Sequence, residues 1–63
     1  MAYGRKIKNL REANGDTQSD LAEKLGISRC YVAMMERGTK PVSLPIADAV
    51  ATLYGVTLED LRG

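Results

Sequence analysis

The chain has 63 residues, a formal net charge of +1, a single cysteine and no histidine. This length predicts one domain, residues 1–63, with one small core and little room for an enclosed substrate pocket. The composition excludes an internal disulfide framework and a Cys/His zinc site, and no stretch resembles a signal peptide or a membrane span.

The first segment with helical spacing ends at Gly15. Within it, Tyr3, Ile7 and Leu10 follow the i, i+4, i+7 rule of an amphipathic helix. The glycine is the residue expected in left-handed conformation just after a helix C-terminus. The start of this segment is basic, with Arg5, Lys6 and Lys8. These three side chains either contact phosphates that flank a binding site or form an ordinary solvated surface.

The second segment runs from Thr17 to Leu25. Thr17 is the expected N-cap, with Asp20 at the third helical position. Leu21, Ala22 and Leu25 then form an apolar stripe. The segment therefore predicts a second helix with one face turned to the core.

The third segment begins almost at once, because Ser28 can cap a helix only three residues after Leu25. Gly26 supplies the positive φ that a tight connection needs. Val32 and Met35 then face inward. Two helices joined by so short a turn, at a large angle, are typical of a helix-turn-helix.

The next stretch, "TKPVS", predicts a loop, since Pro41 restricts Lys40 to extended geometry. Ser43 then caps a fourth helix. Pro45 is tolerated there because the amides of the first helical turn have no intrahelical partner. The apolar positions of this helix are Ile46, Ala47, Val50 and Leu53.

After Gly55, Thr57 and Asp60 predict one last short helical turn. Three apolar or aromatic residues near this end either form a dimer surface or complete the core: Tyr54, Leu58 and Leu61. No run alternates with a period of two residues, so strands are not expected. The predicted fold is all-α, a compact five-helix bundle in which the second and third helices form a helix-turn-helix.

The outward face of the third helix is unusual for a protein surface. On a helical wheel at roughly 100° per residue, the side opposite Val32 and Met35 holds small and sulfur-bearing side chains bordered by arginines. These residues are Cys30, Ala33, Met34 and Arg37, with Arg29 and Tyr31 at the edges. Either the helix is buried on all sides, or this face enters the major groove of DNA. In the groove, the apolar members would touch thymine methyls and Arg29 would donate to guanine O6 and N7.

Charge is distributed unevenly along the chain. Residues 1–40 hold eight of the nine basic residues and five of the eight acids, which gives +3 there and −2 in the remainder. This asymmetry favours an anionic partner for the first two thirds, although an ordinary solvated surface accounts for it equally well.

Catalysis is poorly supported. There is no histidine base, no glycine-rich phosphate loop, and no second group that would activate Cys30 as a nucleophile. Cys30 is instead a small groove-facing residue, a buried core thiol or a redox sensor, and the last is least favoured because the chain has no resolving cysteine. We therefore expect a cytoplasmic protein that is not an enzyme, with no cofactor, metal, membrane partner or small-molecule substrate.

Residues 7–61 resemble the Xre/Cro group of phage-repressor-like regulators. The shared features are Gln18 at the opening of the second helix, the motif "LAEKLGIS", bulky apolar residues at Val32 and Met35, "ERG" at the end of the third helix, and "LYGV" at the end of the fourth. Their combined spacing is far more specific than any single element. The resemblance implies a lambda-repressor-like domain that binds operator DNA as a twofold homodimer and controls transcription.

The resemblance also implies which residues contact DNA. Base contacts carry over to Gln18, Arg29, Cys30 and Met34, with Ala33 near them, and phosphate contacts to Gln18, Tyr31, Arg37, Thr39 and Lys40. With Ser28 at the start of the third helix, these are the expected DNA-contacting residues. A structural pair between Arg11 and Glu36 is implied as well. Cys30 and Met34 stand where common members often have polar side chains that read bases.

Two functions from different classes remain open. The first is a sequence-specific double-stranded DNA-binding regulator, with a repressor favoured, whose third helix enters the major groove of an operator. The second is a protein-interaction module that grips a partner through the apolar face of the third helix. An antitoxin, which binds both DNA and a toxin, lies between the two.

Overall fold

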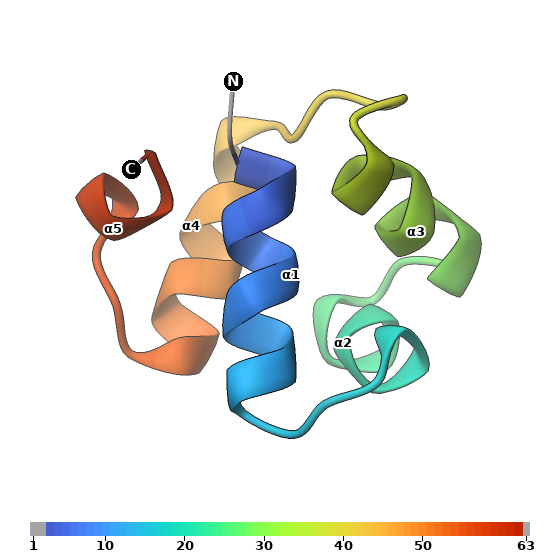
Figure 1. Ribbon diagram of the computed structural model, residues 1–63, viewed down its shortest axis with the longest axis horizontal. Coiled ribbons are helices and arrows are strands. Elements are labelled where there is room, and N and C mark those ends of the chain that lie inside the picture. Colours follow the sequence, from blue (N-terminus) through green and yellow to red (C-terminus); the bar gives the residue numbers. More distant parts are fainter. Residues whose placement is uncertain (1–2, 63) are drawn as a thin grey trace.

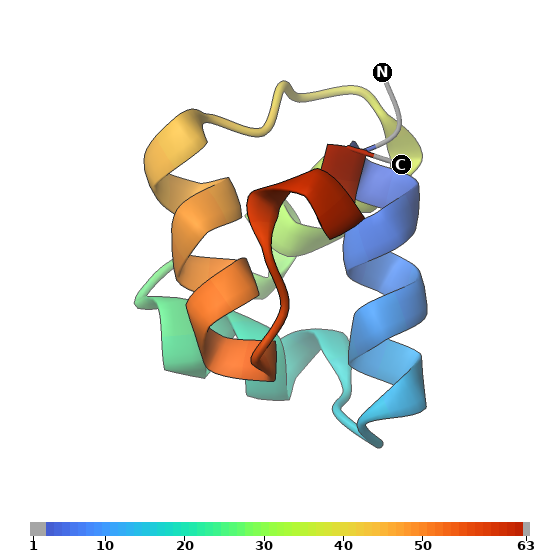
Figure 2. The same ribbon diagram turned by 90° about the vertical axis from the view of Figure 1, so that its left-hand side faces the viewer.

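The computed structural model describes residues 3–62, which form five helices and contain no strand (Figure 1). The helices are α1 (Tyr3–Ala13), α2 (Gln18–Leu25), α3 (Arg29–Arg37), α4 (Leu44–Tyr54) and α5 (Leu58–Arg62). In Figure 1, α1 stands in the middle, with α2 and α3 on one side and α4 and α5 on the other. The short α5 packs against both α1 and α4 (Figure 2). The expected all-α, five-helix fold is confirmed.

One hydrophobic core lies between the helices, and every helix contributes to it. Its buried members are Ile7, Leu21, Ala22, Val32, Met35, Ala47, Val50, Ala51 and Leu61. Burial of each large apolar side chain contributes about 1.5–3 kcal/mol. Leu61 is fully buried, and Tyr54 and Leu58 pack half-buried against the same core. Leu61 therefore completes the core and Tyr54 and Leu58 pack against it, while a part for Tyr54 and Leu58 in a dimer surface stays a prediction.

Side-chain caps start the helices where the sequence predicts them. In α2, the Thr17 hydroxyl accepts from the Asp20 amide, and the Asp20 carboxylate accepts from the Thr17 amide, both at 3.0 Å. In α3, the Ser28 hydroxyl accepts from the Tyr31 amide at 3.0 Å. Equivalent bonds start α4 and α5. Each cap contributes about 1 kcal/mol and fixes the residue at which its helix begins.

The turn between α2 and α3 has the geometry that its glycine predicts. Gly26 has φ 72°, in the left-handed region. The next amide, that of Ile27, donates to the Ala22 carbonyl at 3.0 Å and so closes the end of α2. Ala22 is also buried and belongs to the hydrophobic core. This turn sets the direction in which α3 leaves α2, and with it the side of α3 that stays outside the core.

Asp16 fixes the loop between α1 and α2. Its carboxylate accepts from the Lys24 ammonium and from the Tyr54 hydroxyl, both at 2.9 Å. These hydrogen bonds, from Lys24 first and Tyr54 second, hold the pKa of the Asp16 carboxyl below its usual range. Burial, followed by the Asp16 carboxylate, raises the pKa of Tyr54 well above its ordinary value, so the phenol stays protonated. The end of α4 is thereby tied to the start of the helix-turn-helix.

The structure also shows a close contact that the sequence did not predict. Gly4, in the first turn of α1, lies against the backbone of α3 at Met35 and Glu36. A Cβ at this position would overlap the carbonyl oxygen of Met35. A glycine here therefore allows α1 and α3 to approach more closely than two side-chain-bearing helices would.

Candidate nucleic-acid interface

The third helix has a buried side and an outer side. Val32 and Met35 are fully buried, whereas Arg29, Cys30 and Arg37 are exposed. Ala33 and Met34 are half-buried, as is Tyr31 at the edge of this face. The alternative of a helix buried on all sides is therefore wrong, and so is the alternative that places the Cys30 thiol in the core. What remains is a helix with small, sulfur-bearing and basic side chains on its outer side.

The other expected contact residues lie at the two ends of α3. Ser28 is exposed, and although its oxygen caps the helix, its hydroxyl hydrogen stays available for donation. Beyond Gly38, the Thr39 hydroxyl donates to the Met34 carbonyl at 3.0 Å, while Lys40 is exposed. Contact of each of these residues with DNA stays a prediction.

Gln18 and Arg29 are brought together by the helix-turn-helix, although they are eleven positions apart. The Arg29 guanidinium donates to the Gln18 carbonyl oxygen at 3.4 Å. The Gln18 amide nitrogen donates in turn to the Glu36 carboxylate at 3.0 Å. Both ends of the Gln18 side-chain amide therefore have partners, and its carbonyl oxygen faces the Arg29 guanidinium beside the start of α2.

Glu36 is the anchor of this arrangement. Its side chain is 3% exposed and accepts two bonds from Arg11, from Nε at 2.7 Å and from Nη2 at 3.1 Å. Arg11 also donates to the Asp16 carbonyl at 2.8 Å. The hydrogen bonds to Glu36 raise the pKa of Arg11, so this guanidinium stays charged. The pair of Arg11 and Glu36 implied by the family resemblance is confirmed, and its link to Gln18 is an addition that the structure makes.

A hollow of about 330 Å³ opens where α1, α2 and α3 meet. Its lining residues are Lys8, Gln18, Arg29, Ala33, Glu36 and Arg37. Sequence reasoning grouped Lys8 with Arg5 and Lys6 and did not single it out. A usable signal was present: Lys8 lies three residues before Arg11, so a helix that turns Arg11 toward Glu36 turns Lys8 toward α3 as well.

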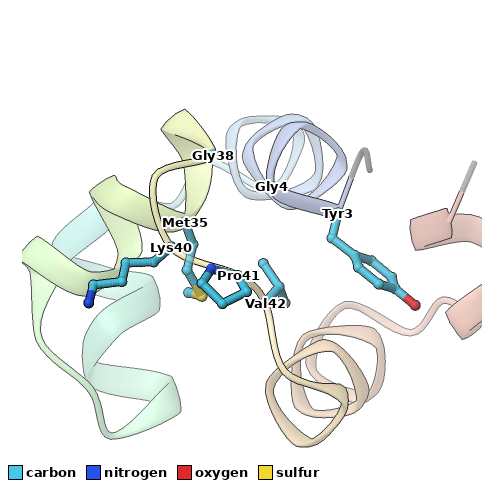
Figure 3. Close-up of a pocket in the computed structure, with 7 residues that line it drawn as sticks. All are labelled: Tyr3, Gly4, Met35, Gly38, Lys40, Pro41 and Val42. Carbon is cyan, nitrogen blue, oxygen red and sulfur yellow. The ribbon is translucent and has the colours of Figure 1, made fainter.

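A second hollow of similar size lies between the start of α1, the end of α3 and the loop that follows (Figure 3). Most of its lining residues are apolar side chains, such as Met35, Pro41 and Val42, or glycines. Figure 3 shows the Lys40 side chain extending away from Tyr3, on the opposite side of the hollow. Since Lys40 is its only charged lining residue, this hollow offers little to a nucleic acid.

Within residues 3–62, no helix is both long and apolar enough to cross a membrane. In the same residues, no group of three or more His, Cys, Asp or Glu side chains is arranged to hold a metal ion.

A capped helix joined by a glycine turn to a second helix, with one side of that second helix exposed, defines a helix-turn-helix domain. A family model described as "Helix-turn-helix" matches residues 7–61. The chain belongs to this family, and its relatives are regulators of the Xre/Cro type. It is thus a member of a family of DNA-binding transcriptional regulators.

The chain is similar over most of its length to several proteins of this kind. It is 41% identical to the uncharacterized HTH-type transcriptional regulator MJ0272 of Methanocaldococcus jannaschii, over 89% of this chain and 85% of that protein. It is 38% identical to the immunity repressor protein of Bacillus phage phi105, over 100% of this chain and 44% of the repressor. It is 35% identical to the antitoxin PezA of Streptococcus pneumoniae, over 95% of this chain and 38% of the antitoxin. The chain therefore spans less than half of the last two relatives.

Solved structures agree with this assignment. The biofilm regulator SinR, in complex with DNA, superimposes with a TM-score of 0.86 at 29% identity, over 97% of this chain and 98% of SinR. The restriction-modification controller protein C.AhdI from Aeromonas hydrophila gives a TM-score of 0.85 at 35% identity, over 95% of this chain and 91% of C.AhdI.

Proposed function

We propose that the protein represses transcription by binding a specific operator in double-stranded DNA through the outer side of α3. The observation that carries this proposal is the two-sided character of α3, with Val32 and Met35 buried and Arg29 and Cys30 exposed. A helix that packs one side on the core and leaves its other side free fits the width of a major groove. Repression rather than activation is favoured by the likeness to a phage immunity repressor.

We infer that the protein acts on DNA as a homodimer. A twofold dimer would place one α3 in each of two successive major grooves, with half-sites about 34–36 Å apart. Such a dimer contacts the same half-site sequence twice, which doubles the free energy of discrimination that one short helix provides. We infer a cytoplasmic location, which membership of the helix-turn-helix family supports.

Within this proposal, the expected DNA-contacting residues have different roles. Arg29 reads a guanine, and the Gln18 side chain positions Arg29. The backbone amide of Gln18 lies at the first turn of α2, where a phosphate binds favourably. Cys30 and Met34 offer apolar surface to thymine methyls. Tyr31, Arg37, Thr39 and Lys40 contact phosphates and fix the register, which carries no sequence information by itself.

Replacing Arg29 by alanine should relax sequence preference at one base pair of each half-site. The bidentate bond to guanine accounts for about 1–3 kcal/mol of discrimination, which corresponds to roughly 5- to 150-fold in relative affinity. Fluorescence anisotropy with the operator and its single-base variants measures this preference. An Arg62→Ala variant is the matched control, because Arg62 is an exposed arginine on α5, outside the helix-turn-helix. If Arg29→Ala keeps the wild-type ranking of operator variants, Arg29 does not read a base.

A protein-interaction module of the antitoxin type is the second candidate, favoured by the likeness to PezA. Salt separates the two functions. Binding to DNA through several phosphates weakens steeply as salt concentration rises, whereas an apolar contact between proteins changes little. A complex with DNA that shows no salt dependence would argue against the DNA-binding proposal.

A further inference from the structure

The hollow between α1, α2 and α3 has the size and the donors to hold a phosphate group. Its volume of about 330 Å³ accommodates a tetrahedral anion together with bridging waters, since one water takes up about 30 Å³. Three of its six lining residues are basic, one from α1 and two from α3: Lys8, Arg29 and Arg37. Basic side chains from two helices thus converge on one small space.

The positive charge of this hollow is not neutralised by its own acidic residue. Glu36 is the only acid in the lining, and its carboxylate is already taken by Arg11 and Gln18. Among residues 3–62, neither Lys8 nor Arg37 forms an ion pair or a side-chain hydrogen bond. Two free cations beside a neutralised carboxylate attract an anion, and the planar fork of an arginine matches phosphate oxygens well.

We propose that this hollow seats one phosphate of the DNA backbone, held by Lys8 and Arg37, so that α1 takes part in DNA binding. The inference rests on the proposed function and extends it by one contact that the helix-turn-helix alone does not supply. Arg29 remains at the side of the hollow with Gln18, free to reach a base. The phosphate then fixes α1 and α3 on the same strand and sets how far α3 enters the groove.

The three basic residues of α1 are not equivalent in this proposal. Lys8 lines the hollow, whereas Arg5 and Lys6 do not. Successive residues of a helix are rotated by roughly 100°, so Lys6 and Lys8 point to nearly opposite sides of α1. The two lysines therefore form a matched pair for an experiment, with the same charge, the same helix and different surroundings.

The test compares Lys8→Gln with Lys6→Gln in binding to the operator across a range of salt concentrations. For wild type, the logarithm of the binding constant falls linearly with the logarithm of salt concentration. Loss of one phosphate contact makes that slope shallower by about 0.9. When salt concentration rises tenfold, the factor by which affinity falls should therefore be roughly eight times smaller for Lys8→Gln than for wild type. Lys6→Gln should keep the wild-type slope. Thermal unfolding of both variants checks that the fold is intact.

Two further arms identify the source of the phosphate. Neutral methylphosphonate linkages, introduced one at a time, should weaken operator binding by wild type at one backbone position, and the loss at that position should be smaller for Lys8→Gln, which keeps only Arg37 at that phosphate. In the absence of DNA, a titration with inorganic phosphate followed by NMR shows whether a free anion enters as well. Saturable shifts at Lys8 and Arg37 support the phosphate chemistry, and the methylphosphonate result assigns it to DNA.

Two results would overturn the inference while leaving DNA binding intact. The first is an unchanged salt slope in Lys8→Gln beside a wild type that binds the operator. The second is an equal decrease of the salt slope in Lys6→Gln and Lys8→Gln, which would indicate general electrostatic attraction rather than a phosphate bound in the hollow. Failure of the wild type itself to prefer any DNA would instead remove the proposed function.

Discussion

Replacement of Glu36 by alanine is expected to destabilise the protein by about 3–5 kcal/mol, because it leaves the buried Arg11 guanidinium without its carboxylate. Glu12, 3.7 Å from Arg11 and largely exposed, compensates for little of this loss. A domain of this length has a total free energy of unfolding of about 3–9 kcal/mol. The variant should therefore lose about a third or more of the free energy of unfolding, and urea unfolding followed by circular dichroism measures the difference.

The double variant Arg11→Met/Glu36→Leu separates the cost of an orphaned charge from the worth of the pair. A protein in which apolar side chains of similar volume replace a buried ion pair is often no less stable than the original. We expect the double variant to recover at least about half of the loss seen in Glu36→Ala. It should still bind DNA less well, because Gln18 loses the carboxylate that holds it beside Arg29. Glu36→Ala within about 1 kcal/mol of wild type would show that the pair does not anchor the fold.

The Gly4→Ala variant is expected to be less stable than wild type by about 1–3 kcal/mol. Helix propensity alone predicts the opposite sign, since alanine is favoured over glycine by up to about 1 kcal/mol within a helix. The added methyl group, however, overlaps the Met35 carbonyl oxygen. That oxygen belongs to the backbone of α3 and cannot rotate away, so α1 and α3 have to move apart.

Thermal unfolding of Gly4→Ala tests this contact. Asn9→Ala is the control, because Asn9 is an exposed residue of the same helix and its replacement by alanine should be neutral or stabilising. A shift of α3 also displaces its outer side relative to α2, so operator affinity should fall together with stability. If Gly4→Ala is as stable as Asn9→Ala, the two helices are not in close contact at Gly4.

Much of this fold is predictable from local sequence. The caps at Thr17, Ser28 and Ser43 and the left-handed glycine at Gly26 have local causes, and all are confirmed. The two sides of α3 follow from its apolar period, which places Val32 inside and Cys30 outside. A wheel cannot by itself distinguish a free outer side from one covered by another helix, and that alternative was excluded only by the packing.

The features that sequence reasoning missed depend on contacts between distant segments. The close approach at Gly4 joins α1 to α3, and neither helix reveals it alone. Two hydrogen bonds depend on the angle between α2 and α3, which the sequence does not give. They run from Gln18 to Glu36 and from Arg29 to Gln18. The place of Lys8 in the hollow depends on the rotation of α1, which the buried Arg11 sets.

Selection of bound sequences from a random pool of double-stranded DNA tests the central claim most directly. If α3 reads the major groove from each half of a dimer, the pool should converge on two inverted half-sites. Their centres should lie about 10–10.5 base pairs, or a whole multiple of this spacing, apart. Each half-site should contain a guanine whose preference disappears when the selection is repeated with Arg29→Ala. A pool that stays random with wild type would contradict the claim that α3 reads DNA sequence. The same enriched sequence from wild type and from Arg29→Ala would contradict the claim that Arg29 reads a guanine.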